Sequence, residues 1–360
     1  MTPAPSTRER ELDLLSRLAL AGDGGSAVGD VAAMDDQRRG AFLKLAHGHH
    51  VVIRSLRPLQ AAALRAGASE VADWAAANLS REQDRIANAL EFLDAVCREL
   101  EAAGCPITVM KSLDHWPDIG NDLDLYTTAT KDATRKVFEQ KFQAQALHRT
   151  WGDRLADKCS YRVPGLRATV EVHHGRLGQT GEHRVLARRF IARRVPVHLA
   201  DYTFLVPAPE ERVIAATLQR MYRHLYVRIC DVVNTSALVE AGELDYDELR
   251  SAADDGGVWR GVASYLKIVA DYLARYCDRT LQLPSSVTSA ALLDGKALFV
   301  RGTWLRVPVF PGVASLYGRQ MAAMALHGDV PGTFRLGLLP PLASMAKLAY
   351  KITGDPRGIW

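Results

Sequence analysis

The chain has 360 residues, of which 48% are hydrophobic and 24% are charged, the ordinary balance of a globular protein with a sizeable core in one to three domains. The five cysteines are scattered, which argues against a zinc site or a disulfide framework and favours reduced thiols. The net charge of +4 permits an anionic substrate such as a nucleotide or RNA without requiring one.

The N-terminus carries alternating charges rather than the apolar segment of a signal peptide. No apolar run approaches the roughly 18–20 residues of a membrane span. We therefore expect a cytoplasmic protein without a membrane span.

The first hundred residues are predicted to be helical. A short amphipathic helix lies within residues 1–24, and residues 35–66 are helical around His47, His49 and His50, which form either a polar turn, the favoured interpretation, or a metal site. Ser80 and Gln83 have the spacing of a capping box, so a long helix is expected to begin there and to end near Gly104.

Residues 107–125 are the stretch around which the chain is organised. An apolar run, residues 107–110, leads into Lys111 and Ser112, and ten residues later Asp122 and Asp124 alternate with leucines. Because strand side chains have a period of two, both aspartates share one face and both leucines enter the core. Two such close carboxylates repel each other unless a cation lies between them, and oxygen ligands of this kind suit Mg²⁺.

A second acidic strand is predicted after a helix at residues 130–142. Short β-like runs cover residues 146–151, 159–163 and 167–173, and Gly165 marks a hairpin turn between the last two. Glu171 and His173 share one face of the last run. Lys158 is expected near the mouth of the site, with solvent exposure as the default.

The remaining chain, from residue 182 onward, is predicted to be mostly helical with a few strands. The arginine-rich residues 182–194 form either a solvated helix face or a phosphate contact, and residues 195–206 are predicted to be one strand. From Pro209 to about Cys277 the pattern is helical, with Arg228 and Asp231 three residues apart. Residues 298–310 form a possible β segment, and the basic tail ending at Trp360 either docks on the helical half or touches a membrane surface.

These motifs resemble the polymerase-β-like nucleotidyltransferase superfamily, and more closely its family of uncharacterised bacterial nucleotidyltransferases. The resemblance covers roughly residues 80–280 and rests on Lys111-Ser112, Asp122-Leu123-Asp124, Glu171-Val172-His173, and Arg228 with Asp231. Ser112 stands where that family usually has glycine.

The resemblance implies an α+β fold: a small mixed-sheet nucleotidyltransferase core with N-terminal helices and a C-terminal helical domain. The expected units are residues 1–79 (helical), 80–207 (core), 208–293 (helical) and 294–360 (extension).

It also implies an Mg²⁺-dependent transferase that moves NMP from an NTP, ATP among them, to a hydroxyl. Two Mg²⁺ ions would be held by the catalytic residues Asp122, Asp124 and Glu171. The nucleotide would contact Lys111, Ser112, His173, Arg228 and Asp231, although an ion pair between the last two is an equal alternative.

The acceptor stays open among a small molecule, a sugar, a protein and tRNA. The alternative functions are a degenerate, non-catalytic nucleotide- or RNA-binding protein of the same fold and an interaction protein built on the helical regions.

Overall fold

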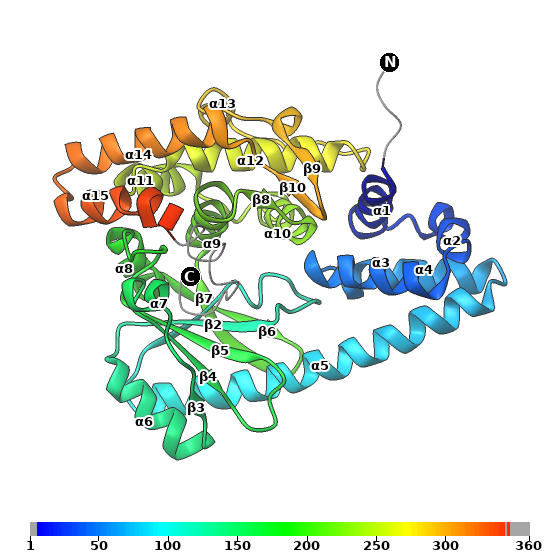
Figure 1. Cartoon of the computed structure of the whole chain (residues 1–360), viewed down its shortest axis with the longest axis horizontal. Coiled ribbons are helices and arrows are strands. Elements are labelled where there is room, and N and C mark those ends of the chain that lie inside the picture. The colour runs from blue at the N-terminus through cyan, green and yellow to red at the C-terminus, as the bar shows by residue number, and fades with distance from the viewer. Residues whose placement is uncertain (1–5, 343, 346–360) are drawn as a thin grey trace.

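The N-terminal part of the computed structural model, which describes residues 6–342 and 344–345, is a group of helices (Figure 1). It comprises α1 (Thr7–Ser16), the π-helical turn η1 (Arg17–Ala21), α2 (Gly24–Ala32), α3 (Asp36–Gly48) and α4 (Val52–Arg65). The Ser16 hydroxyl lies 2.8 Å from the Tyr272 hydroxyl of α12 (Trp259–Ala274), so this group packs on the C-terminal helices.

Helix α5 (Ser69–Ala102) connects this group to the central sheet and runs along one side of the molecule (Figure 1). The expected start at Ser80 is wrong. Val71, Ala72 and Ala75 continue the buried apolar face of the helix toward its N-terminus, and Ser80 is an exposed residue inside the helix. The predicted boundary between residues 79 and 80 thus falls within one helix, and the division into four units stays a prediction.

The central sheet is mixed, with the strand order β1-β2-β5-β4-β3. Strand β2 (Asp122–Thr127) pairs antiparallel with β1 (Ile107–Met110) and parallel with β5 (Thr169–His174). The predicted hairpin at Gly165 is confirmed: β4 (Lys158–Arg162) pairs antiparallel with β5, and Gly165 has φ +84°. Strand β3 is only Gln145–Ala146; residues 147–150 of the expected run are irregular, and α7 (Trp151–Leu155) begins at its last residue.

Helices α5 and α6 (Lys131–Phe142) pack together beside this sheet (Figure 1). Phe138 of α6 stacks on Tyr161 of β4 with ring centroids 4.1 Å apart, and both are fully buried. One continuous apolar core joins the sheet to the N-terminal and C-terminal helices, so the strands that carry acidic residues rest on a rigid support.

A separate hairpin follows helix α8 (Arg184–Ala192). The single strand expected at residues 195–206 is instead β6 (Arg194–Leu199) and β7 (Tyr202–Pro207), because the chain reverses at Ala200, whose φ is +50°. The arginine-rich run is divided. Arg184 and Arg188 are exposed, as expected of a solvated helix face. Arg189 instead forms ion pairs with Glu211 and Glu248, and Arg193, just after the helix, forms one with Glu210.

The C-terminal half is mostly helical. After α9 (Pro209–Thr217) come the π-helical turn η2 (Leu218–Arg223), α10 (Ile229–Glu240), α11 (Tyr246–Asp255) and α12. Then follow α13 (Ser285–Thr288), η3 (Gly295–Ala297), η4 (Val309–Val313), α14 (Ala314–Leu326) and α15 (Val330–Gly337).

The β segment predicted at residues 298–310 is a hairpin of β9 (Phe299–Arg301) and β10 (Trp304–Arg306), to which β8 (Tyr226–Val227) adds a third strand. The predicted basic tail, with Lys347, Lys351, Arg357 and Trp360, lies outside the described residues. Among the described helices, none combines the length and the apolar composition needed to cross a bilayer.

The observed architecture is therefore the predicted α+β class: a mixed sheet of five strands with helices at both ends of the chain.

Candidate active site

The turn after β1 places a lysine and a serine against β2. Lys111 has φ +57°, and its Nζ lies 2.7 Å from Asp124 Oδ1. Ser112 is buried, and its Oγ accepts a hydrogen bond from the Asp124 backbone N–H at 2.8 Å. The left-handed residue of this turn is Lys111, and Ser112 has no positive φ, so serine in place of glycine causes no backbone strain.

The alternation of β2 and β5 brings the acidic residues to one face. In the parallel register Asp124 is opposite Glu171 and Asp122 is opposite Thr169. The intervening residues face the core and are fully buried: Leu123, Leu125, Val170 and Val172. The face-sharing expected from the sequence is confirmed.

Asp124, Glu171 and His173 form the centre of the site. One potential ligand atom from each lies within 4.8 Å of the other two. His173 Nε2 lies 2.9 Å from Glu171 Oε1 and 3.4 Å from Asp124 Oδ1. Lys158 Nζ lies 2.8 Å from Glu171 Oε2 and 3.0 Å from Asp153, so this lysine is part of the site and not a solvated residue at its mouth.

Asp122 lies at the open end of the same face. It is exposed, and its carboxylate accepts a short hydrogen bond from the Thr169 hydroxyl. It is not part of the close cluster of Asp124, Glu171 and His173, but it lines the same cavity as Asp124 and Glu171.

Lysine and histidine neighbours keep the central carboxylates ionised. Burial alone would raise the pKa of Asp124, but Lys111 and the hydrogen bond with His173 hold that pKa below its ordinary value. Burial would also raise the pKa of Glu171, and His173 and then Lys158 hold it well below its usual range. For Asp122, partial desolvation, followed by the charges of Asp124 and Glu171, raises the pKa although the residue is exposed.

A cavity of about 260 Å³ separates these residues from the helical half of the chain. We call its strand side the acidic wall (Asp122, Asp124 and Glu171 with Lys111 and Lys158). We call the opposite side the basic wall; it is formed by η2 and the segment that follows, with Arg220, Arg223, His224 and Arg228. A π-helical turn at this place is a feature often found at functional sites.

Arg228 and Asp231 do not form the mutual ion pair that was one alternative. The Asp231 carboxylate accepts a hydrogen bond from the Arg228 backbone N–H at 2.7 Å, which caps α10, and forms a buried ion pair with Arg220, also at 2.7 Å. The Arg228 guanidinium turns the other way and lies 2.5 Å from His50 Nε2 in the cavity.

The histidines near residue 50 connect the N-terminal helices to the site. His49 accepts a hydrogen bond from the Ile229 N–H at 3.1 Å and lies 2.7 Å from the Thr303 carbonyl, and burial lowers its pKa to about 4. His50 stacks on His115 at 4.9 Å, and both rings line the cavity. The favoured polar turn is therefore a buried connection at His49 and His50, and His50 contacts an arginine and a histidine rather than a carboxylate.

Hydrogen bonds to α4 and α5 hold the loop between β1 and β2 in place. Asp118 is buried and accepts hydrogen bonds from the Ile53 and Arg54 backbone N–H groups at the start of α4. Arg85 of α5 donates to the Ile119 and Gly120 carbonyls. Both contacts fix the path of the chain into Asp122.

Sequence reasoning missed His115 and the residues of the basic wall other than Arg228, and it singled out His50 without placing it at this cavity. A signal did exist: Arg220, Arg223, His224 and Arg228 follow one another within nine residues without an intervening carboxylate.

The fold and this site define a nucleotidyltransferase-type core: a mixed sheet that presents acidic residues on adjacent strands beside a lysine-bearing turn. A sequence model of the family described as an uncharacterised nucleotidyltransferase matches residues 35–274, which is more than half of the chain. The protein therefore belongs to this family, and membership supports a transferase. A comparison with curated proteins finds no match.

Proposed function

We propose that the protein is an Mg²⁺-dependent nucleotidyltransferase that moves NMP from an NTP, ATP among them, to an acceptor hydroxyl. The observation that carries the proposal is the pairing of walls: three carboxylates on one side of a single cavity and three arginines on the other. A metal-bound triphosphate has complementary parts, since its cation needs anionic oxygens and its phosphates need cationic donors.

The donor set fits a hard divalent cation. Asp124 and Glu171 supply carboxylate oxygens within one small cluster, and Asp122 offers a further carboxylate at the open end. Oxygen ligands of this kind suit Mg²⁺, and we propose Asp122, Asp124 and Glu171 as its ligands, with His173 positioning Glu171. Such an ion would neutralise phosphate charge and lower the pKa of the attacking hydroxyl.

The other residues of the cavity bind and orient the nucleotide in this proposal. Lys111 and Ser112 stand beside Asp124, where the ammonium can exchange its carboxylate partner for a phosphate. Arg223 and Arg228 donate to phosphate oxygens from the basic wall, and Asp231 acts by holding Arg220 and the Arg228 backbone in place.

The transfer balances without any further reactant. The acceptor oxygen forms a bond to the α-phosphorus while the bond to the bridging oxygen breaks, and pyrophosphate leaves with the electron pair. The hydroxyl proton passes to a carboxylate of the site or to water. The described cysteines are free, which fits the reducing cytoplasm that we propose as its location.

The test is incubation with each α-labelled NTP, Mg²⁺ and cell extract, followed by identification of the labelled molecule. Asp124→Asn should lower labelling by about 10³-fold, which corresponds to about 4 kcal/mol of transition-state stabilisation. The matched control is Asp132→Asn, which changes an exposed carboxylate on α6 that pairs with Arg135, and it should keep full activity.

Labelling that persists after chelation of the metal or in Asp124→Asn would contradict the proposal. NTP binding without Mg²⁺ and without label transfer would identify the non-catalytic binder instead. Absence of any NTP-dependent thermal shift would favour the interaction protein.

A further inference from the structure

The small sheet β8-β10-β9 has two chemically different faces. Antiparallel pairing places Phe299 opposite Arg306, Arg301 opposite Trp304, and Tyr226 opposite Arg306. Directly paired residues of antiparallel strands project to the same side. One face, which we call the basic-aromatic face, therefore carries Tyr226, Phe299, Arg301, Trp304 and Arg306, while the other carries the more deeply packed Val227, Val300 and Leu305.

This face lines a groove of about 640 Å³ whose charge has one sign. Arg8 of α1 joins Arg301 and Arg306 there, and the lining contains no carboxylate. Within residues 6–342 and 344–345, none of these three guanidinium groups lies within 4 Å of a carboxylate. The groove therefore favours an anionic ligand.

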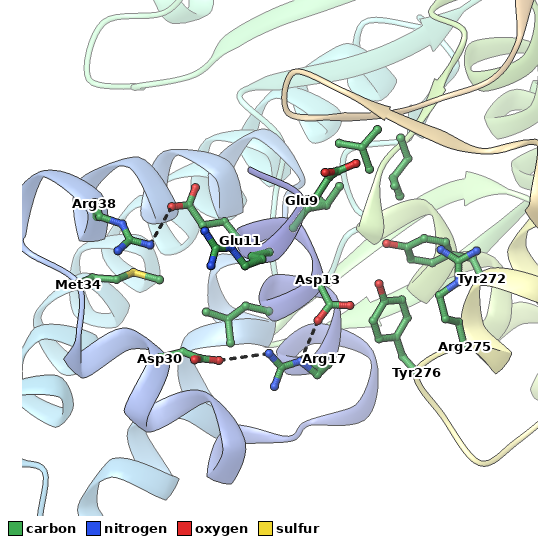
Figure 2. A pocket seen from close by; sticks show the side chains of 15 residues that line it. Glu9, Glu11, Asp13, Arg17, Asp30, Met34, Arg38, Tyr272, Arg275 and Tyr276 are labelled. Carbon is green, nitrogen blue, oxygen red and sulfur yellow. Dashed lines mark hydrogen bonds and ion pairs between the residues drawn. The ribbon is translucent and has the colours of Figure 1, made fainter. Parts of the chain in front are cut away.

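The pocket between the N-terminal helices and α12 gives the contrasting case (Figure 2). There Arg17 is paired with Asp13 and Asp30, and Arg38 is paired with Glu11. Arg17 and Arg38 are thus neutralised by carboxylates, whereas within the described residues Arg8, Arg301 and Arg306 of the groove have no carboxylate partner.

Aromatic rings on this face contact the guanidinium groups of Arg306 and Arg228. Tyr226 stacks on Trp304 with ring centroids 4.4 Å apart. The Arg306 guanidinium lies 5.2 Å from the Tyr226 ring centre, and the Arg228 guanidinium lies 5.7 Å from that ring and 5.6 Å from the Trp304 ring. Phe299 is 46% exposed and leaves its ring available to a stacking partner.

The groove lies next to the cavity between the two walls. His224 lines both spaces, and Arg228 extends from the Trp304 ring to the cavity. A chain-like ligand in the groove would therefore lead its end toward Asp124 and Glu171.

We propose that the basic-aromatic face binds single-stranded nucleic acid and that a terminal hydroxyl of this strand is the acceptor of the NMP. The identification of the acceptor rests on the proposed function. Arginines separated by aromatic rings recognise such a strand, because phosphates pair with the guanidinium groups and bases stack on the rings. The transfer step is the one given above, with the terminal ribose or deoxyribose hydroxyl as the attacking group.

The test measures fluorescence anisotropy of labelled RNA and DNA strands about 12 nucleotides long. The double variant Arg8→Glu with Arg301→Glu should weaken binding by at least about 10-fold and reduce its salt dependence. The matched control is Arg135→Glu with Arg250→Glu, which changes net charge equally at exposed arginines far along the chain from the face. Melting temperatures should confirm that both variants fold.

Two parallel measurements separate the possible failures. The Mg²⁺- and NTP-dependent thermal shift and pyrophosphate release report on the proposed function, and the double variant should keep the thermal shift. If the wild type shows neither the thermal shift nor pyrophosphate release, the proposed function is rejected, whether or not the protein binds the strands. Equal strand binding by the double variant and its control, or binding without labelling of the strand, would overturn the inference.

Vesicles of phosphatidylcholine and phosphatidylglycerol test the competing anionic surface. If the wild type binds these vesicles through Arg8 and Arg301 and binds no strand, the face is a membrane contact and the inference is wrong.

Discussion

The acidic wall and the basic wall of the cavity differ in how their charges are balanced. On the acidic wall every central carboxylate has its own cation: Asp124 is 2.7 Å from Lys111, and Glu171 is 2.8 Å from Lys158. On the basic wall Arg220 is paired with Asp231, but within the described residues Arg223 and Arg228 have no carboxylate within 4 Å. The central carboxylates of the acidic wall are thus neutralised within the fold, whereas the basic wall has positive charge that no carboxylate of the described residues neutralises.

The largest expected effect concerns the one buried acid behind the basic wall. Asp231→Asn leaves the buried Arg220 guanidinium without its partner, and we expect a loss of about 3 kcal/mol in the free energy of unfolding. Urea denaturation measures it. The control Asp254→Asn removes an exposed pair with Arg250 and should change stability by less than about 0.5 kcal/mol. A similarly small change in Asp231→Asn would show that the basic wall does not need this pair.

Low pH should reduce the free energy of unfolding through the buried histidines and through Asp124 over different pH ranges. Burial lowers the pKa of His49 and His115 to about 4 and that of His224 to about 3. Each folded pKa lies below the unfolded value, so the stabilisation is complete above about pH 6.5 and is lost as pH falls toward the folded pKa. The stabilisation that comes from the lowered pKa of Asp124 is lost only as the pH falls below about 4.

One buried group acts in the opposite direction. Burial raises the pKa of Asp118 to about 7, so its stabilisation is present below about pH 4 and is lost as pH rises to about 7. A single histidine is therefore best isolated by comparison of variants. Between pH 7 and pH 5, wild-type protein should lose about 2 kcal/mol more than His115→Asn, as measured by urea unfolding at both pH values. Equal losses would contradict the neutral state assigned to His115.

The smallest effect tests the turn that joins β1 to the acidic wall. Ser112→Ala removes the hydrogen bond to the Asp124 backbone N–H, and we expect a loss of about 1 kcal/mol in the free energy of unfolding. Ser251→Ala, an exposed position on α11, should show no such loss. An unchanged stability of Ser112→Ala would mean that the acidic wall is fixed by strand pairing alone.

The acidic wall could be predicted from sequence because it depends on local period. Within each strand the acidic residues alternate with core residues, so the pattern places Asp122 and Asp124 on one face of β2 and Glu171 on one face of β5. The pairing of β2 with β5 is a long-range contact, and the family resemblance rather than the pattern pointed to it.

The basic wall could not be predicted in the same way. His50 and Arg228 are 178 residues apart in the chain, and the packing of the N-terminal helices on the C-terminal half brings them together. The arginine-rich residues 182–194 showed the limit of composition as a guide, since glutamates of α9 and α11 neutralise Arg189 and Arg193. Charge available to a ligand depends on partners from distant elements, which a local pattern does not contain.

Helix α5 has a practical consequence for protein engineering. Its 34 residues correspond to about 50 Å of continuous rod. Arg85, in the middle of the helix, donates hydrogen bonds to the backbone carbonyls shortly before Asp122, and residues nearer the C-terminus of the helix pack against the sheet. A fragment that begins at residue 80 would have a frayed helix end close to Arg85, so a truncated protein should begin before Ser69.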